Sequence, residues 1–252
     1  MVDARPLLIY LPGLDGTGKL FYRQEIPLAA YCEVRALSLP VDDSSSWEDL
    51  AARVHTLLPE DPARPVILCG ESFGGCIALV AAAMHPERFS RLVLINPATS
   101  WRRQTLLSRG ANWLTLFPGG IFRGAALVFL PFLAAVNRMK PQDRKILLTT
   151  LRLVPASTVL HRLQLLDKLD LEADLSRLTM PVLLVAGAAD RLLPSVAEVK
   201  YLAERIKDVR VEILPYSGHA ALIEAELDLA ALLVRYGFLK LADPVEIGRA
   251  DE

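Results

Sequence analysis

Short apolar stretches alternate with segments of helical periodicity along most of the chain. Six stretches of five or six residues are expected to be strands. One of them, 65–69, is apolar and rich in β-branched side chains, which is typical of a buried strand of a parallel sheet. Apolar residues between these stretches recur at helical spacing, as Trp47, Leu50 and Val54 do. The expected strands lie at 7–11, 33–38, 65–69, 91–95, 182–186 and 210–214.

This alternation predicts a doubly wound, mostly parallel α/β sheet of about six strands with helices on both faces. One helix is expected to begin after Ser46, whose hydroxyl can cap it, with Asp49 completing a capping box. The 252 residues are 52% hydrophobic, which is enough for one domain with a large core.

The segment 101–179 interrupts the alternation because it holds helical and irregular apolar sequence but no convincing strand. It stands between two expected core strands, so the chain must leave the sheet and return to it. We therefore expect residues 1–100 and 180–252 to form the core and residues 101–179 to form an inserted helical cap, or lid. Between 101 and 152 this segment carries nine basic residues and one acid, interleaved with large apolar side chains.

Composition and charge exclude several classes of function. The formal net charge of −1 argues against a nucleic-acid partner. The three cysteines, Cys32, Cys69 and Cys76, are odd in number and are not spaced for a metal site or a disulfide framework. We expect no metal, no cofactor and a reducing, cytoplasmic location. No signal-peptide pattern is present, and the longest apolar stretch, 124–137, is too short to span a bilayer.

The run Gly70-Glu71-Ser72-Phe73-Gly74 lies between an expected strand and an expected helix. A G-x-S-x-G sequence in that context is the nucleophile elbow, a turn so tight that the serine backbone is strained and only glycines fit beside it. The turn would present the Ser72 hydroxyl at a helix N-terminus, where a developing oxyanion is stabilised. The alternative is a plain strand-turn-helix with a capping serine.

A serine hydroxyl needs an imidazole to accept its proton and an acid to orient that imidazole. In a doubly wound sheet such groups gather at the carboxyl ends of strands. Asp190 and His219 each follow an expected strand, and the order Ser72, Asp190, His219 is the one expected for this architecture. Asp15 in the first loop is a weaker candidate for the acid, and Asp190 could instead cap the next helix.

Two backbone N–H groups are expected to form the oxyanion hole. One belongs to Phe73, the residue after the nucleophile, and the other to Leu14 in the loop after the first strand. That loop, 11–18, is rich in glycine, but it lacks the G-K-[ST] ending of a phosphate-binding loop. A nucleotide-binding role is therefore disfavoured.

With these residues the chain resembles the α/β-hydrolase superfamily along nearly all of its length. It is more closely similar to the hydrolase portion of plant and cyanobacterial phytyl-ester-synthase-like lipases. Such lipases often carry an acyltransferase-like domain after the hydrolase part, whereas this sequence ends soon after His219, which argues against synthase activity. The stretches that carry the resemblance are L-P-G-L-D-G-T-G at 11–18, L-C-G-E-S-F-G-G-C at 68–76, L-I-N-P-A-T-S at 94–100, A-G-A-A-D-R-L-L-P-S at 186–195 and Y-S-G-H at 216–219.

The resemblance and the residues together imply a serine carboxylester hydrolase, an esterase or lipase that acts on lipid-like acyl esters or thioesters through an acyl-enzyme. Asp15 and the aromatic residues Trp113, Phe117, Phe122 and Phe129 are expected to contact the substrate, although ordinary packing is the alternative for the aromatic residues. Two other functions stay open: acyl transfer to an alcohol in place of water, and a catalytically silent binding protein on the same fold.

The basic and aromatic residues of the inserted segment also suit an anionic membrane surface. A solvated basic face over a buried apolar one is the alternative. We therefore expect a small-molecule acyl ester as the substrate, peripheral membrane contact through the cap and no nucleic acid. The residues leave the oligomeric state open.

Overall fold

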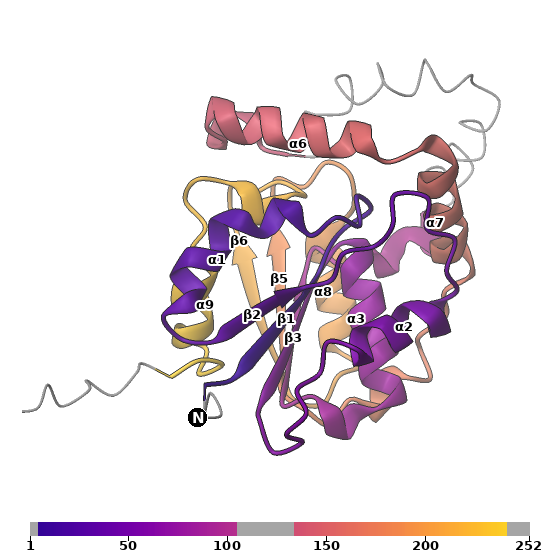
Figure 1. Cartoon of the computed structure of the whole chain (residues 1–252), viewed down its shortest axis with the longest axis vertical. Coiled ribbons are helices and arrows are strands. Elements are labelled where there is room, and N and C mark those ends of the chain that lie inside the picture. Colours follow the sequence, from indigo (N-terminus) through magenta and orange to yellow (C-terminus); the bar gives the residue numbers. More distant parts are fainter. Residues whose placement is uncertain (1–4, 105–133, 241–252) are drawn as a thin grey trace, which may run out of the picture.

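A sheet of six parallel strands runs through the centre of the molecule (Figure 1). The computed structural model describes residues 5–104 and 134–240. The strands are β1 (Leu7–Leu11), β2 (Glu33–Ala36), β3 (Val66–Glu71), β4 (Arg91–Ile95), β5 (Val182–Gly187) and β6 (Val209–Leu214). They lie in the order β2-β1-β3-β4-β5-β6, and every neighbouring pair is parallel. This confirms the predicted doubly wound α/β class.

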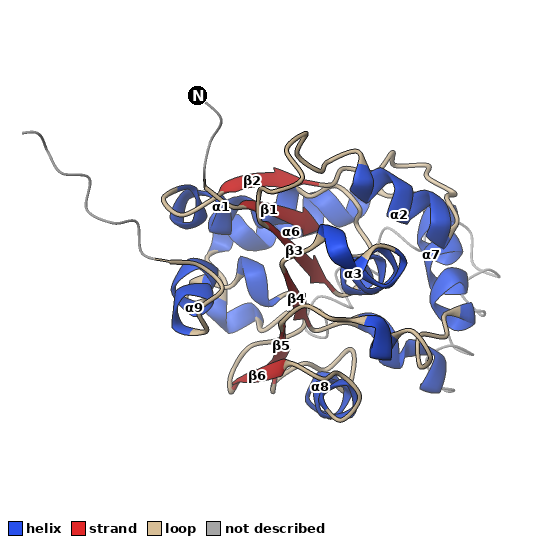
Figure 2. Ribbon diagram, turned by 90° about the horizontal axis from the view of Figure 1, so that it is seen from below, coloured by secondary structure: helices blue, strands red, loops and turns tan. Residues whose placement is uncertain are grey.

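Helices cover both faces of this sheet (Figure 2). The helices are α1 (Tyr22–Ala29), α2 (Trp47–His55), α3 (Phe73–Met84), α6 (Pro141–Leu153), α7 (Ala156–Lys168), α8 (Ser195–Ala203) and α9 (Leu229–Arg235). Helices α1 and α9 lie on one side of the sheet, and α2, α3 and α8 lie on the other.

An apolar cluster lies on each face of the sheet, and together the two clusters explain why a central strand such as β1 is continuously apolar. In β1, Leu7, Ile9 and Leu11 face the cluster that includes α2, α3 and α8, whereas Leu8 and Tyr10 face the cluster that includes α1 and α9. All five side chains are fully buried. A strand covered on both faces has no solvent-facing positions, so its sequence shows no polar alternation.

The ends of the elements agree with the sequence to within two residues. The capping box at the start of α2 is present, because Ser46 Oγ accepts from Asp49 N at 3.2 Å and Asp49 Oδ2 accepts from Ser46 N at 3.0 Å. Strand β3 is longer than predicted, because its pairing with β4 continues as far as Glu71 opposite Ile95. Strand β3 therefore ends at the residue directly before Ser72.

The described part of the segment 101–179 contains helices and no strand. Helix α6 lies across the carboxyl ends of the strands, and α7 descends beside α2 (Figure 1). The buried carboxyl of Asp143 on α6 bonds to Arg23 and Tyr22 of α1, at 3.0 Å for the arginine. Within the described ranges, no helix is both long and apolar enough to cross a bilayer.

Candidate active site

Ser72 stands in a strained turn between β3 and α3. Its φ is 55° and its ψ is −117°, a backbone conformation that residues other than glycine rarely adopt. The flanking glycines are required by close approach of the backbone: a Cβ on Gly70 would lie 2.3 Å from Gly74 O, and one on Gly74 would lie 2.0 Å from Leu11 O. The sequence motif at 70–74 therefore folds as an elbow.

His219 connects Ser72 to Asp190. Its Nε2 lies 2.8 Å from Ser72 Oγ, and its Nδ1 lies 2.7 Å from Asp190 Oδ2. Because Nδ1 faces a carboxylate, we assign the ring proton to Nδ1, so that the Ser72 hydroxyl donates to Nε2. Ser72 and His219 are 7% and 5% exposed, so this chain of hydrogen bonds is shielded from water. The structure thus brings together the three side chains predicted from the sequence.

Asp190 is held as a carboxylate by several donors. Its Oδ1 accepts from the N–H groups of Leu192 and Leu193 at 2.8 and 3.0 Å, and its Oδ2 accepts from the Ser195 hydroxyl at 2.5 Å. Burial raises the pKa of Asp190, but His219, the Ser195 hydroxyl and the Leu193 N–H outweigh burial and hold the pKa below its ordinary value. Asp190 does not cap α8, whose N-cap residue is Pro194, and its bonds to Leu192 and Leu193 close the loop before that helix.

The two residues predicted to supply oxyanion donors, Leu14 and Phe73, are each adjacent in the chain to a residue close to or at the nucleophile. Phe73 is the first residue of α3, and Leu14 follows Gly13, where a Cβ would be 3.6 Å from Ser72 Cβ. Among the described residues, neither amide N–H has a hydrogen-bond acceptor. That these two N–H groups form the oxyanion hole stays a prediction.

Asp15 has a local structural role. Its Oδ2 accepts from the N–H and the hydroxyl of Thr17 at 2.8 and 2.6 Å, which closes the turn after β1. Burial raises the pKa of Asp15, and the bonds from Thr17 offset this only in part. His219 Nδ1 bonds to Asp190, so Asp15 is not the acid that orients the imidazole.

Asn96 holds in place the loop that carries His219. This role was not predicted from the sequence. Its Nδ2 donates to Gly218 O at 3.0 Å and to His219 O at 2.7 Å, while its Oδ1 accepts from Gly187 N at 2.8 Å. The residue is fully buried at the end of β4 with φ of 44°, a conformation that asparagine tolerates better than most residues. An asparagine directly after a core strand was the available signal.

Glu224 is a second residue that sequence reasoning missed. Its buried carboxylate accepts from Gly218 N at 2.7 Å and from Arg138 Nε at 3.2 Å. Arg138 lies in the inserted segment, so this ion pair connects that segment to the loop before His219. No local sequence pattern around Glu224 indicates this contact.

Three further predictions concerned aromatic substrate contacts, the cysteines and metal binding. The aromatic residues Trp113, Phe117, Phe122 and Phe129 fall outside the described residues. Cys69 and Cys76 are buried, as expected from their positions in a strand and a helix, and Cys32 is buried as well. Within the described ranges, no group of three or more His, Cys, Asp or Glu side chains is placed to hold a metal ion.

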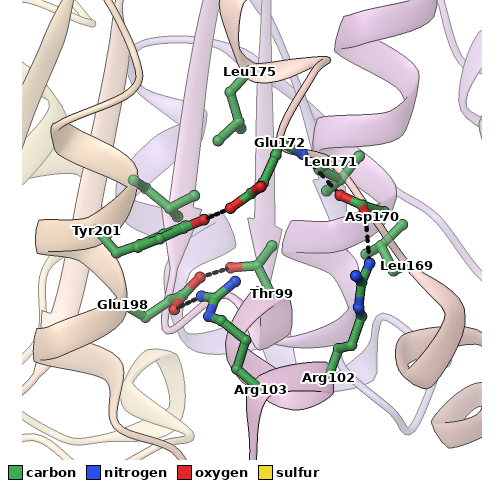
Figure 3. Close-up of a pocket in the computed structure, with 11 residues that line it drawn as sticks. Thr99, Arg102, Arg103, Leu169, Asp170, Leu171, Glu172, Leu175, Glu198 and Tyr201 are labelled. Atoms are coloured by element: carbon green, nitrogen blue, oxygen red, sulfur yellow. Dashed lines mark hydrogen bonds and ion pairs between the residues drawn. The ribbon is translucent and has the colours of Figure 1, made fainter.

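A small cleft of about 110 Å³ lies apart from Ser72, between α8 and the chain that returns from α7 (Figure 3). Its charged groups bind each other: Arg102 pairs with Asp170 at 2.6 Å, and Glu198 pairs with Arg103 and accepts from Thr99. Ser72 and His219 do not line it. We therefore do not place the ester in this cleft.

Comparison with protein families gives a match to the serine aminopeptidase family S33 over residues 41–226. The matched range contains Ser72, Asp190 and His219 and covers most of the chain. The chain belongs to the serine aminopeptidase S33 family. The family match, together with an esterase among the relatives of this chain, identifies it as a hydrolase.

Two relatives match nearly the whole chain. The pimeloyl-[acyl-carrier protein] methyl ester esterase of Aromatoleum aromaticum is 30% identical over 250 residues, which cover 91% of this chain and 97% of the esterase. Phytyl ester synthase 1, chloroplastic, of Arabidopsis thaliana is 29% identical over 259 residues, which cover 92% of this chain. The chain spans 37% of the length of that synthase and 14% of phytyl ester synthase 2 of the same plant.

Solved structures share the fold. MenH from S. aureus superposes with a TM-score of 0.78 at 17% identity, covering 93% of this chain and 94% of MenH. The esterase EaEST from Exiguobacterium antarcticum superposes with a TM-score of 0.78 at 18% identity, covering 92% of this chain and 91% of EaEST. These similarities confirm the α/β-hydrolase fold that the sequence motifs predicted.

Proposed function

We propose that this hydrolase is a serine carboxylester hydrolase that works through an acyl-enzyme on Ser72. The observation that carries the proposal is the position of His219, which lies within hydrogen-bond distance of both Ser72 and Asp190. In this role His219 is the general base and acid, and Asp190 orients it. The N–H groups of Leu14 and Phe73 hold the oxyanion.

The reaction proceeds in two half-reactions. Ser72 Oγ attacks the ester carbonyl while its proton passes to His219 Nε2, and the carbonyl oxygen becomes the oxyanion. The carbonyl re-forms, the bond to the leaving alcohol or thiol breaks, and His219 gives the proton to that leaving group. Water then attacks the acyl-enzyme, with His219 taking its proton. The carboxylic acid is released as Ser72 regains a proton from His219.

We further propose that the substrate is a lipid-like acyl ester or thioester and that residues 101–179 form the cap over it. Two relatives support this class of substrate: an esterase of a pimeloyl methyl ester on acyl-carrier protein, and a phytyl ester synthase. The position of α6 across the carboxyl ends of the strands supports the role of a cap.

A fluorophosphonate probe tests the nucleophile. We expect the wild-type protein to become labelled and to hydrolyse p-nitrophenyl acyl esters, and Ser72→Ala to lose both, with at least about a 10³-fold fall in kcat. Ser90→Ala is the control, because its hydroxyl bonds only a strand carbonyl, Val66 O, at 2.9 Å. Labelling that persists in Ser72→Ala would refute the nucleophile, and a wild-type protein that is neither labelled nor active would favour a silent binding protein.

A panel of p-nitrophenyl and CoA esters of increasing chain length tests the substrate class. We expect kcat/KM to rise with acyl length, because an apolar pocket gains affinity with each buried methylene. A preference for acetyl over all longer chains would contradict a lipid-like substrate.

Acyl transfer to an alcohol is a second candidate function. The 29% identity to phytyl ester synthase 1 over most of this chain favours it. The same acyl-enzyme would then pass its acyl group to an alcohol oxygen in place of water. Product analysis with a long-chain alcohol present distinguishes the two, since ester formation at the expense of free acid identifies the transferase.

A further inference from the structure

The side chain of Arg162 is buried against the loop that follows β1. The residue lies on α7 in the inserted segment and is 1% exposed. Its Nη1 donates a 2.7 Å hydrogen bond to Leu14 O. A Cβ on Gly16 would lie only 2.6 Å from the same nitrogen, so the loop closes tightly around the guanidinium. The inserted segment thus reaches the residue that carries one proposed oxyanion donor.

The same guanidinium contacts the residue that carries the other proposed donor. Arg162 Cζ lies 5.9 Å from the centre of the Phe73 ring, which is within the range of a cation–π contact. The Phe73 side chain is fully buried and also packs against Trp47, with ring centres 5.2 Å apart. One cationic group therefore touches both residues whose N–H groups would bind the oxyanion.

The charges around Arg162 argue against a binding site for an anionic ligand. Asp43 Oδ2 lies 4.0 Å from Arg162 Nη2, and the carboxyl of Asp15 also attracts the guanidinium. Two acidic groups thus already face one positive charge. An added anion would meet their repulsion in a buried setting, where such repulsion is strong.

Stability alone does not account for this arginine. Its Nε and Nη2 are buried and have no hydrogen-bond acceptor among the described residues. Removing a guanidinium from water is costly, and incomplete hydrogen bonding does not offset that cost. An apolar replacement would avoid that cost, but it would leave the buried carboxyls of Asp43 and Asp15 without this cation. The contacts with Leu14 O and the Phe73 ring, and not a gain in stability, are therefore what points to a role in activity.

We propose that Arg162 is a positioning residue of the oxyanion hole, which rests on the proposed ester hydrolysis at Ser72. The bond to Leu14 O fixes the plane of the peptide that follows the Leu14 N–H, and the contact with the Phe73 ring restrains the start of α3. Donors that are fixed in advance stabilise the transition state more than the bound substrate. Through Arg162, the geometry of the hole depends on α7 being docked.

The test compares Arg162→Met, Arg162→Lys and Thr158→Val in steady-state kinetics with a p-nitrophenyl ester. Thr158 is the matched control, because it lies one turn earlier on α7 and its Oγ1 also donates to a loop carbonyl, Val41 O, at 2.8 Å. That bond ties α7 to the loop before α2 and not to Leu14. Inhibition by a trifluoromethyl ketone is measured in parallel, since its addition to Ser72 places an oxyanion in the hole.

We expect Arg162→Met to lower kcat by about 10- to 100-fold with little change in KM, and to weaken the ketone by a similar factor. Arg162→Lys should restore part of the loss, because its ammonium can still donate to Leu14 O. Thr158→Val should keep the kcat of wild type. Urea unfolding is measured for each variant, and Arg162→Met is expected to lose stability because Asp43 and Asp15 lose a cationic partner. The ketone inhibition separates this loss from an effect on the oxyanion hole, because it is measured on the folded enzyme.

Three results would overturn the proposal: an unchanged kcat in Arg162→Met, an equal loss in Thr158→Val, or a loss of kcat without any weakening of the ketone. Failure of the proposed ester hydrolysis would give a different set of results. In that case the wild-type protein itself hydrolyses no ester and is not labelled by the fluorophosphonate, whatever stands at position 162.

Discussion

The carboxyl group of Glu71 is buried directly before Ser72 in the chain. The Tyr10 hydroxyl donates to its Oε2 at 3.0 Å. Burial raises the pKa of Glu71 from its ordinary value of 4.5 to about 7, and the charge of His219 opposes the rise only in part. Between these two pH values the folded protein holds a proton that the unfolded chain releases. The resulting stability is complete below about pH 4.5 and is lost as the pH rises through 7.

Glu71→Gln should remove this pH dependence, because a glutamine is neutral at every pH and can still accept from Tyr10. Relative to wild type, we expect the variant to gain up to about 3 kcal/mol in free energy of unfolding between pH 5 and pH 8. Urea unfolding at both pH values measures this difference. Glu25→Gln, at an exposed position, is the control. A stability difference between Glu71→Gln and wild type that is equal at the two pH values would contradict the account.

The helices depend on local features that short sequence patterns can encode. Helix α2 begins with a reciprocal capping box between Ser46 and Asp49, and both hydrogen bonds were predictable from the spacing of the two residues. The strands were equally predictable from short apolar runs. Their ends were less so, because β3 continues to Glu71 through its pairing with a strand that lies more than twenty residues away in the chain.

Removing the cap of α2 should weaken the fold without altering the site. Ser46→Ala leaves an N–H at the helix start without its acceptor, and we expect a loss of about 1 kcal/mol in free energy of unfolding. Ser44→Ala, an exposed serine in the same loop, should cost nothing measurable. Urea unfolding compares the two, and equal stabilities of the two variants would show that the capping box does not stabilise α2.

Across the molecule, some of the described basic residues of the inserted segment are paired with acids and others are exposed. Arg102, Arg103 and Arg138 pair with acids of the described residues. Lys145 and Arg152 instead lie exposed on α6. We propose that this basic surface of α6 provides the peripheral membrane contact expected from the sequence, since unpaired cations near a surface are attracted to anionic lipids.

Sedimentation with liposomes tests the basic surface of α6. We expect the protein to bind vesicles that contain anionic lipid more strongly than neutral ones, and the variant carrying Lys145→Glu and Arg152→Glu to bind them at least about tenfold less. Lys200→Glu, an exposed change on α8, should bind like wild type. Equal binding to neutral and anionic vesicles would count against membrane contact.

The chain's local patterns were enough to predict its fold class and the three side chains that meet at the candidate site. The apolar runs specified a parallel sheet, and the elbow at Ser72 was evident because strand, glycines and serine are neighbours in sequence. Asp190 and His219 could be selected because parallel strands end at one edge of a sheet, so residues just after them are brought together.

Asn96, Glu224 and Arg162 could not be assigned in this way. Each bonds to atoms far away in the chain. Asn96 bonds to the last residue of β5 and to the loop after β6, Glu224 to Arg138, and Arg162 to Leu14. Such contacts depend on how helices and loops pack over the sheet, and on which way each side chain points there. Short patterns record local conformation and burial, but a polar contact across more than eighty residues is fixed only when the folded chain has placed both partners.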